Sequence, residues 1–350
     1  MCDVGFIWCS IVGLVCCGYV LCDVEDWASD IRCRDNTHMP VDWWILYKPS
    51  RSSLRRGRNY TFLTPYSEGR WETSSVHITS YSMLMNTIAP IWTDELVQKN
   101  LAVLIYTERS GIQGSAAKGI LMADREGGVW VTHTVPGFPD VMQEMMSFPD
   151  NEIENGHLMT CMALDHAALD GIFRVIAQTN PNVQKMQVPS HLSHLLPNWN
   201  KMPVPGDTKV VDFFTHDKRL NPILVARKPG DTHCLFEVFA KAKKVIFDIY
   251  DRNKHDTFCD KEYGVRQIKA ISIKFPGEVH YIENSTDRAT FGVSTAAHWQ
   301  KTGAGPTQYW ACIGSYEEPS IYPRGSMLIC ILNYDVWFAF SNLKLNEPSC

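Results

Sequence analysis

Short apolar runs bounded by turn residues recur along this chain and restrict its fold more than any other feature. Runs rich in β-branched and aromatic residues, bounded by Gly, Pro or Asp, are typical of strands, and they cover residues 41–48, 101–107, 118–124, 128–135, 157–164, 209–215, 222–228 and 269–275. Residues 167–178 and 234–250 instead have apolar side chains at helical spacing. Strands mixed with helices indicate an α/β fold, and a 45% hydrophobic content is enough to build its core.

The order of these elements predicts two lobes. At roughly 150 residues per domain, a chain of 350 residues corresponds to about two units. The segment 187–207 contains four prolines and is typical of a connector. We therefore expect a first lobe at about 28–186 and a second lobe at about 208–350.

The first 22 residues form an apolar segment with a single charged side chain, Asp3. The run 4–22 has about the length of a secretory h-region and barely reaches the ~20 residues that span a bilayer. We favour a cleaved secretory signal at 1–22 over an uncleaved N-terminal anchor, although no Lys or Arg precedes the run. The expected mature domain is 23–350, and it contains no later stretch suited to a stable membrane span.

The cysteines indicate the same compartment. Five of the twelve lie in the first 22 residues, and the other seven form no Cys-x-x-Cys pair. This pattern favours disulfides in an oxidising environment over a zinc site, so no metal is expected. Glycosylation sequons at Asn59 and Asn284 agree with secretion. We expect an extracellular protein, with the lysosome as the second choice.

The net charge of -5 gives no basic field over the whole molecule, so a polyanion site has to be a local patch. The segment 48–58 carries five positive charges in eleven residues. A solvated loop is the simpler interpretation of this segment. It is nevertheless the best local candidate for contact with nucleic-acid phosphates, through Arg51, Arg55, Arg56 and Arg58.

Several longer segments, in the same order along the chain, resemble the deoxyribonuclease II family: PVDWWILYKP (40–49), VWVTHTVPGFP (129–139), GHLMTCMAL (156–164), WACIGSY (310–316) and RGSMLIC (324–330). The resemblance extends from about Cys33 to Cys350. It implies a phospholipase D-like pseudo-dimer of two α/β lobes in one chain, each with a His-x-Lys motif at a shared cleft. The activity it implies is hydrolysis of DNA phosphodiester bonds at acidic pH without metal or cofactor.

This chain departs from the family at both motifs. Ala116 stands at the first histidine position, and Lys118 keeps the lysine; Ala296 stands at the second histidine position, and His298 replaces the lysine. In the family one imidazole attacks phosphorus and the other protonates the leaving oxygen, and a methyl group can do neither. We therefore expect a catalytically impaired protein that acts by binding DNA, another polyanion or a protein partner.

Alternatives stay open at each remaining candidate. A rearranged site with His298 and His133 would make the chain an active acid endonuclease, and a third hypothesis is a secreted module that does not use the cleft. Lys118 is either a phosphate ligand or a structural lysine held by Asp124. Asp124 matches an acidic position of the family or simply forms a turn, and His133 is either an acid–base group or a core histidine.

The resemblance also implies three disulfides, Cys33–Cys161, Cys259–Cys350 and Cys312–Cys330. Cys234 is then left over, and a buried, inert thiol is the expected state of this residue.

Overall fold

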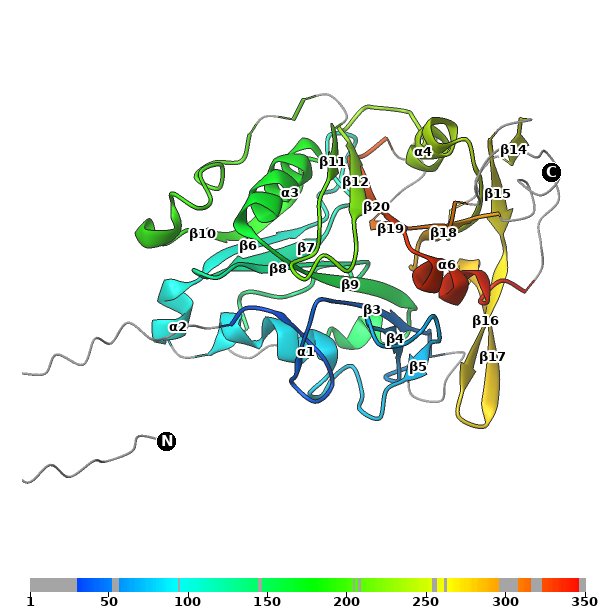
Figure 1. Ribbon diagram of the computed structural model, residues 1–350, viewed down its shortest axis with the longest axis horizontal. Coiled ribbons are helices and arrows are strands. Elements are labelled where there is room, and N and C mark those ends of the chain that lie inside the picture. Colours follow the sequence, from blue (N-terminus) through cyan, green and yellow to red (C-terminus); the bar gives the residue numbers. More distant parts are fainter. Residues whose placement is uncertain are drawn as a thin grey trace, which may run out of the picture.

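The computed structural model describes residues 30–51, 57–93, 95–143, 147–203, 205–206, 209–253, 257–260, 263–295, 308–315 and 323–345. Within these residues the chain forms a mixed α/β fold dominated by two eight-stranded sheets (Figure 1). The expected α/β class is therefore confirmed.

The first sheet is antiparallel throughout, in the order β10-β6-β7-β8-β9-β3-β4-β5. Its strands are β3 (Trp43–Lys48), β4 (Thr61–Leu63), β5 (Glu72–Thr73), β6 (Ala102–Thr107), β7 (Gly119–Ala123), β8 (Gly128–His133), β9 (His157–Leu164) and β10 (Asn182–Gln187). Strands β3 and β6 to β9 are buried along their whole length. Because both faces of these strands are covered, their sequences are continuous apolar runs without alternation.

The second sheet has the order β11-β12-β20-β19-β18-β13-β15-β14 and contains one parallel pair, β13 with β15. Its strands are β11 (Lys209–Asp212), β12 (Pro222–Arg227), β13 (Ile246–Tyr250), β14 (Phe258–Cys259), β15 (Gly264–Ile268), β18 (Phe291–Ser294), β19 (Trp310–Ser315) and β20 (Ser326–Leu332). Two small antiparallel pairs complete the strands: β1 (Cys33–Arg34) with β2 (Pro40–Val41), and the hairpin β16 (Ala270–Phe275) and β17 (Glu278–Glu283).

The described helices are α1 (Met83–Ile88), α2 (Glu95–Asn100), α3 (His166–Gln178), α4 (Leu235–Lys243) and α6 (Tyr334–Ser341), with short 3₁₀ turns at Ala89–Trp92, Asp150–Glu152, Ser190–Leu192 and Asn284–Thr286. Helix α3 matches the predicted helix at 167–178. It begins where the Asp165 carboxylate accepts a hydrogen bond of 2.7 Å from the Ala168 amide.

The helical interpretation of 234–250 is wrong in its second half. Helix α4 ends at Lys243, because Lys244 adopts a left-handed conformation with φ 54°. The following residues, 246–250, form strand β13, which pairs with β15 on one side and β18 on the other. Their β-branched and aromatic side chains suit a buried central strand, and two neighbouring strands outweigh the helical spacing.

One hydrophobic core joins the two sheets. It combines inward-facing residues of the first sheet, such as Ile45 and Leu104, with residues of the second sheet, such as Leu224 and Val293. Helix α3 contributes to this core and contacts β8, β11 and β12, so it lies between the sheets (Figure 1). Because the sheets share a core, loops from both meet at a common boundary.

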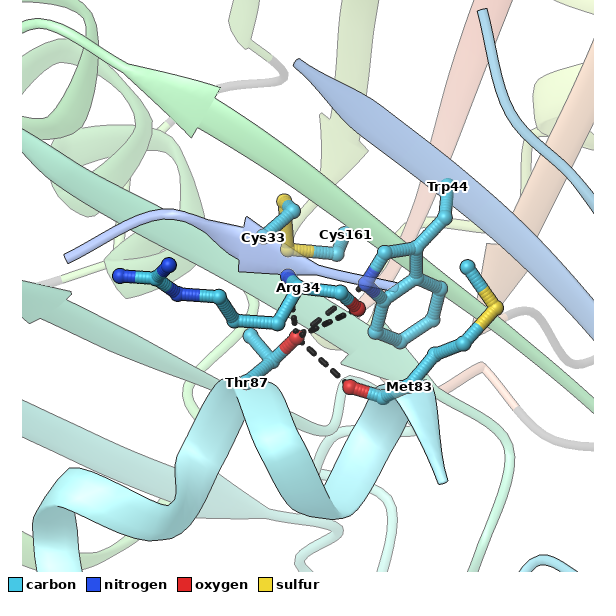
Figure 2. The surroundings of a disulfide bond; sticks show 6 residues. All are labelled: Cys33, Arg34, Trp44, Met83, Thr87 and Cys161. Atoms are coloured by element: carbon cyan, nitrogen blue, oxygen red, sulfur yellow. Dashed lines mark hydrogen bonds between the residues drawn. A yellow bond between two sulfur atoms is a disulfide. The ribbon is translucent and has the colours of Figure 1, made fainter. Parts of the chain in front are cut away.

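Two of the predicted disulfides are confirmed. Cys33–Cys161 connects β1 to β9, and beside it the Thr87 hydroxyl accepts hydrogen bonds from the Arg34 amide and the Trp44 indole (Figure 2). Cys312–Cys330 connects directly opposed residues of β19 and β20.

The other two cysteine predictions have different outcomes. Cys259 is disulfide-bonded, but its predicted partner Cys350 lies outside the described residues. Cys234 was expected to be buried, but it is half-buried, because it lies at the N-cap position at the start of α4. Across the part of the chain that the structure describes, no helix has both the length and the apolar composition to cross a membrane.

Candidate functional site

A cavity of about 370 Å³ lies where the two sheets meet, and both sheets contribute to its wall. The first sheet and its loops supply Ala116, Lys118, Thr134 and Pro136; the second supplies Asp251, Arg252, Asn253, Arg288, Thr290, Gly314, Ser315 and Arg324. Four of these side chains are cationic and one is a carboxylate. The wall is therefore suited to an anionic ligand.

The segment before β7 is fixed at this boundary by backbone contacts with the second sheet. The Ala116 amide donates to the Gly325 carbonyl at 2.7 Å, and the Gly325 amide donates to the Gly114 carbonyl at 2.9 Å. Residue 325 has to be glycine, because a Cβ there would lie 2.1 Å from the Thr179 carbonyl oxygen. This pairing holds Ala116 at the cavity wall.

Lys118 lies at the start of β7, with its side chain 12% exposed at the cavity. Its Nζ donates to the Ala116 carbonyl at 2.8 Å and lies 3.9 Å from Glu108 Oε2. Burial alone would raise the pKa of Glu108, but the Lys118 charge and the Thr107 hydroxyl outweigh it and hold that pKa below its ordinary value. Glu108 is thus an anionic neighbour of the Lys118 side chain.

Asp124 lies at the other end of β7, and the five-residue strand separates it from Lys118 by roughly 20 Å. Its carboxylate accepts hydrogen bonds from the amides of Ile31, Glu126 and Gly127. The structure therefore places Asp124 in the β7–β8 turn, where it also contacts the N-terminal segment at Ile31. It lies away from the cavity and from Lys118. This geometry agrees with the turn-forming alternative.

His133 ends β8 and is 1% exposed, with its ring edge-on to Phe138 at 5.3 Å. Neither ring nitrogen makes a well-formed hydrogen bond within the described part of the chain. Burial, followed by the charges of Lys118 and His157, lowers the pKa of His133 to about 3. His133 does not line the cavity, and its placement agrees with the core-histidine alternative.

Asp251 supplies the carboxylate of the second sheet. Its Oδ2 accepts from the Thr290 hydroxyl at 2.8 Å, and its Oδ1 accepts from the Asn253 amide at 2.6 Å. The side-chain amide of Asn284, which belongs to a glycosylation sequon, donates to the Asp251 carbonyl at 2.7 Å. Asn284 therefore helps to fix the backbone of Asp251, which belongs to the cavity wall.

Arg288 connects the cavity to the first sheet. Its Nε lies 3.2 Å from Glu152 Oε2, and the same carboxylate oxygen lies 3.1 Å from His157 Nε2. Burial is the largest influence on His157 and lowers its pKa to about 4, although Glu152 opposes the decrease. At neutral pH the Glu152 charge is therefore balanced by Arg288 and not by the imidazole.

A buried acidic group lies beside Arg288 in sequence. The Asp287 carboxylate accepts hydrogen bonds from the hydroxyls of Tyr47, on the first sheet, and Tyr250, on the second. Burial raises the pKa of Asp287 to about 6, and the two tyrosines, the Ala289 amide and the Lys48 charge moderate this increase. Burial also lowers the pKa of Lys48 to about 8.

The predicted basic loop is only partly described. Arg51 is exposed and forms an ion pair with Glu154, and Arg58 is exposed; neither lines the cavity. Four further candidates lie outside the described residues: Arg55, Arg56, Ala296 and His298. The sequon residue Asn59 is half-buried next to Arg58.

Three cationic residues of the cavity were missed by sequence reasoning: Arg252, Arg288 and Arg324. Arg252 follows β13 by two positions, and Arg324 precedes β20 by two positions. No predicted strand ended beside these arginines, because residues 246–250 were interpreted as helical and residues 326–332 were not among the predicted strands. Recognising β13 and β20 would have given the signal, since charged residues just beyond strand ends lie at the boundary between the sheets. No group of three or more His, Cys, Asp or Glu side chains in the described ranges is arranged to hold a metal ion.

Comparison with known proteins gives a consistent result. The family model described as deoxyribonuclease II matches residues 32–350. Similar proteins include human deoxyribonuclease-2-beta, 24% identical over 92% of both chains, and rat deoxyribonuclease-2-alpha, 26% identical over 90% of this chain and 93% of the rat protein. Plancitoxin-1 from Acanthaster planci is 24% identical over 91% of this chain and 92% of its own length.

Proposed function

We propose, from the premise that this chain belongs to the deoxyribonuclease II family, that its cavity binds the phosphate backbone of DNA without cleaving it. The observation that carries this proposal is the composition of the cavity wall. Lys118, Arg252, Arg288 and Arg324 line the same cavity as Ala116, which occupies the position where the family resemblance places a histidine.

The binding part of the proposal follows from charge. The wall carries four cations and the carboxylate of Asp251, while Glu108 lies 3.9 Å from Lys118 and Glu152 lies 3.2 Å from Arg288. Four cations against these three carboxylates leave the cavity an excess of one positive charge on a chain whose net charge is -5. Arginine binds phosphate oxygens through two parallel N–H groups, whereas lysine acts as a point charge. The cavity receives these side chains from both sheets, so a phosphate there would contact both halves of the protein.

The loss of cleavage follows from the reactive groups that the wall offers. Among its described residues there is no imidazole or thiol. The Thr290 hydroxyl donates to Asp251, and the Ser315 hydroxyl donates to the His133 carbonyl at 2.9 Å. His133 is buried behind the wall with a pKa of about 3, which makes it a poor proton donor or acceptor near pH 5.

The test combines cleavage with binding. Supercoiled plasmid is incubated with the purified protein at pH 5 in the presence of a chelator, and DNA binding is measured by fluorescence anisotropy over a range of salt concentrations. We expect no nicking, together with an affinity that falls as salt rises. The variants Lys118→Ala and Arg324→Ala should each weaken binding and reduce the salt dependence by about one counterion per lost contact.

Matched controls identify the site. Lys185→Ala removes a cation that lies on β10, outside the cavity, and should leave DNA affinity unchanged. Robust nicking that is lost in His298→Ala would overturn the proposal in favour of a working endonuclease. Salt-independent, negligible binding would instead favour a module that recognises a protein partner.

The location that fits this function is extracellular, with the lysosome as the second choice. The disulfides Cys33–Cys161 and Cys312–Cys330 support an oxidising compartment. Secretion of a tagged full-length chain into the culture medium, compared with a chain that lacks residues 1–22, tests this part of the proposal.

A further inference from the structure

A second concave surface lies at the boundary between the sheets, formed by the turn before β5, the β16–β17 hairpin and α6. It encloses about 480 Å³, and we call it the aromatic groove; its wall includes Arg70, Trp71, Ile273, Lys274, Phe338 and Leu343. None of these residues lines the cavity that contains Lys118. The aromatic groove is therefore a separate feature of the same boundary.

Aromatic rings in and beside this groove are exposed and held in place. Phe338 is 37% exposed and Tyr334, one turn earlier on α6, is 52% exposed. Their rings are stacked, with centroids 5.7 Å apart and planes inclined by 18°. The Trp71 indole donates to the Ala339 carbonyl at 3.0 Å and packs edge-on against Phe340. Rings fixed in this way lose little conformational entropy when a flat ligand binds.

The charge of the groove indicates what kind of flat ligand fits. Of the described residues that form its wall, two are cations, Arg70 and Lys274, and none is a carboxylate. Both cations are exposed, and neither has an ion-pair partner within the described ranges. Flat apolar rings next to two solvated cations are complementary to a ligand that carries aromatic rings and negative charge.

We propose that the aromatic groove binds unpaired bases of a single-stranded nucleic acid, with a base against Phe338 and neighbouring phosphates against Arg70 and Lys274. Stacking on an aromatic side chain tolerates any base, because every base has a π-face. The choice of ligand class rests on the proposed function, but the residues involved are different from those of the cavity. The groove would bind a strand whose bases are unpaired, whereas the cavity would contact only the phosphate backbone of the nucleic acid.

The experiment compares two fluorescent ligands of equal length and charge, an oligothymidylate and an abasic deoxyribose-phosphate oligomer. We expect tighter binding of the oligothymidylate, and Phe338→Ala should weaken this binding about tenfold without affecting the abasic oligomer. Arg70→Ala combined with Lys274→Ala should weaken binding of both oligomers and reduce the salt dependence. Circular dichroism verifies folding, and Tyr334→Ala replaces Phe338→Ala if the latter does not fold.

Two comparisons make the result decisive. Tyr81→Ala removes an aromatic ring that is 76% exposed outside the groove and should bind both oligomers like the parent protein. Equal affinities for the two oligomers, or preferential binding of a neutral oligosaccharide that Phe338→Ala abolishes, would overturn the inference. Lys118→Ala with Arg324→Ala tests the cavity separately: if duplex binding survives this change while the groove variants behave as expected, the proposed function fails and the groove stands.

Discussion

The Tyr47 hydroxyl donates a hydrogen bond to the Asp287 carboxylate and thereby joins the end of β3 to the loop that precedes β18. At residue 156 beside them, a Cβ would lie 2.3 Å from Asp287 Oδ1, so any residue other than glycine would displace this carboxylate. The boundary that forms the cavity is thus held in part by buried ionisable groups. The stability of the protein should consequently depend on pH in the acidic range.

We expect Asp287→Asn to stabilise the protein at pH 7 and to have little effect near pH 4. Burial raises the pKa of Asp287 from 3.8 to about 6, so between these values the folded protein holds a proton that the unfolded chain has released. This carboxyl group therefore adds stability as pH falls from 6 to 4, and its ionised form costs about 3 kcal/mol at pH 7. Urea unfolding at a series of pH values measures the difference.

The exposed Asp212 offers a matched control, since Asp212→Asn should shift stability by a small amount that does not follow this profile. An Asp287→Asn variant that is less stable than the parent at pH 7, and approaches it only at pH 4, would contradict the assignment.

A substitution of His133 should have the opposite pH profile. Because burial lowers the pKa of His133 to about 3, its contribution to stability is complete above pH 6.5 and is lost progressively as pH falls towards 3. His133→Leu should therefore gain about 2 kcal/mol relative to the parent between pH 7 and pH 5, as measured by urea unfolding. DNA binding should stay unchanged. Loss of binding or of any cleavage in this variant would indicate a functional role for the imidazole.

Restoring the family motifs should restore cleavage. Ala116 belongs to the cavity wall, so a histidine at this position would lie next to the cavity. We expect the triple variant Ala116→His, Ala296→His and His298→Lys to nick plasmid at pH 5 about 100-fold or more faster than the parent protein. Each single variant should remain inactive, because both imidazoles act in one unit. A folded, DNA-binding triple variant without activity would show that other groups have also been lost.

The two described disulfides should differ in their contribution to stability. Cys33–Cys161 closes a separation of 128 residues, and Cys312–Cys330 closes one of 18. In the chain-entropy model a loop of about 100 residues gains about 4.7 kcal/mol and one of about 15 gains about 3 kcal/mol. Replacing both cysteines of each pair by alanine and measuring denaturant unfolding should reproduce this order. The reverse order would assign the dominant effect to local packing, such as that around Thr87.

The strands of the cavity wall were predictable because their signal is local. Runs such as 118–124 and 128–135 are apolar, short and bounded by turn residues, and the structure forms β7 and β8 there. The segment 234–250 was misjudged, because helical spacing in its first half continues into residues that two neighbouring strands recruit as β13. Whether such a segment forms a helix or a strand depends on the neighbouring strands with which it pairs in the folded protein.

Amino-acid identity alone determines that neither Ala116 nor Ala296 can act as a nucleophile, whatever the fold. It also identifies cysteines that can be joined, such as Cys33 and Cys161. Which polar groups face the cavity was decided by tertiary packing. Arg252, Arg288 and Arg324 come from three separate loops and meet because the two sheets share one core, whereas the same packing buries His133. Periodicity acts over a few residues, but a site between sheets depends on contacts more than a hundred residues apart, and those contacts exist only in the folded chain.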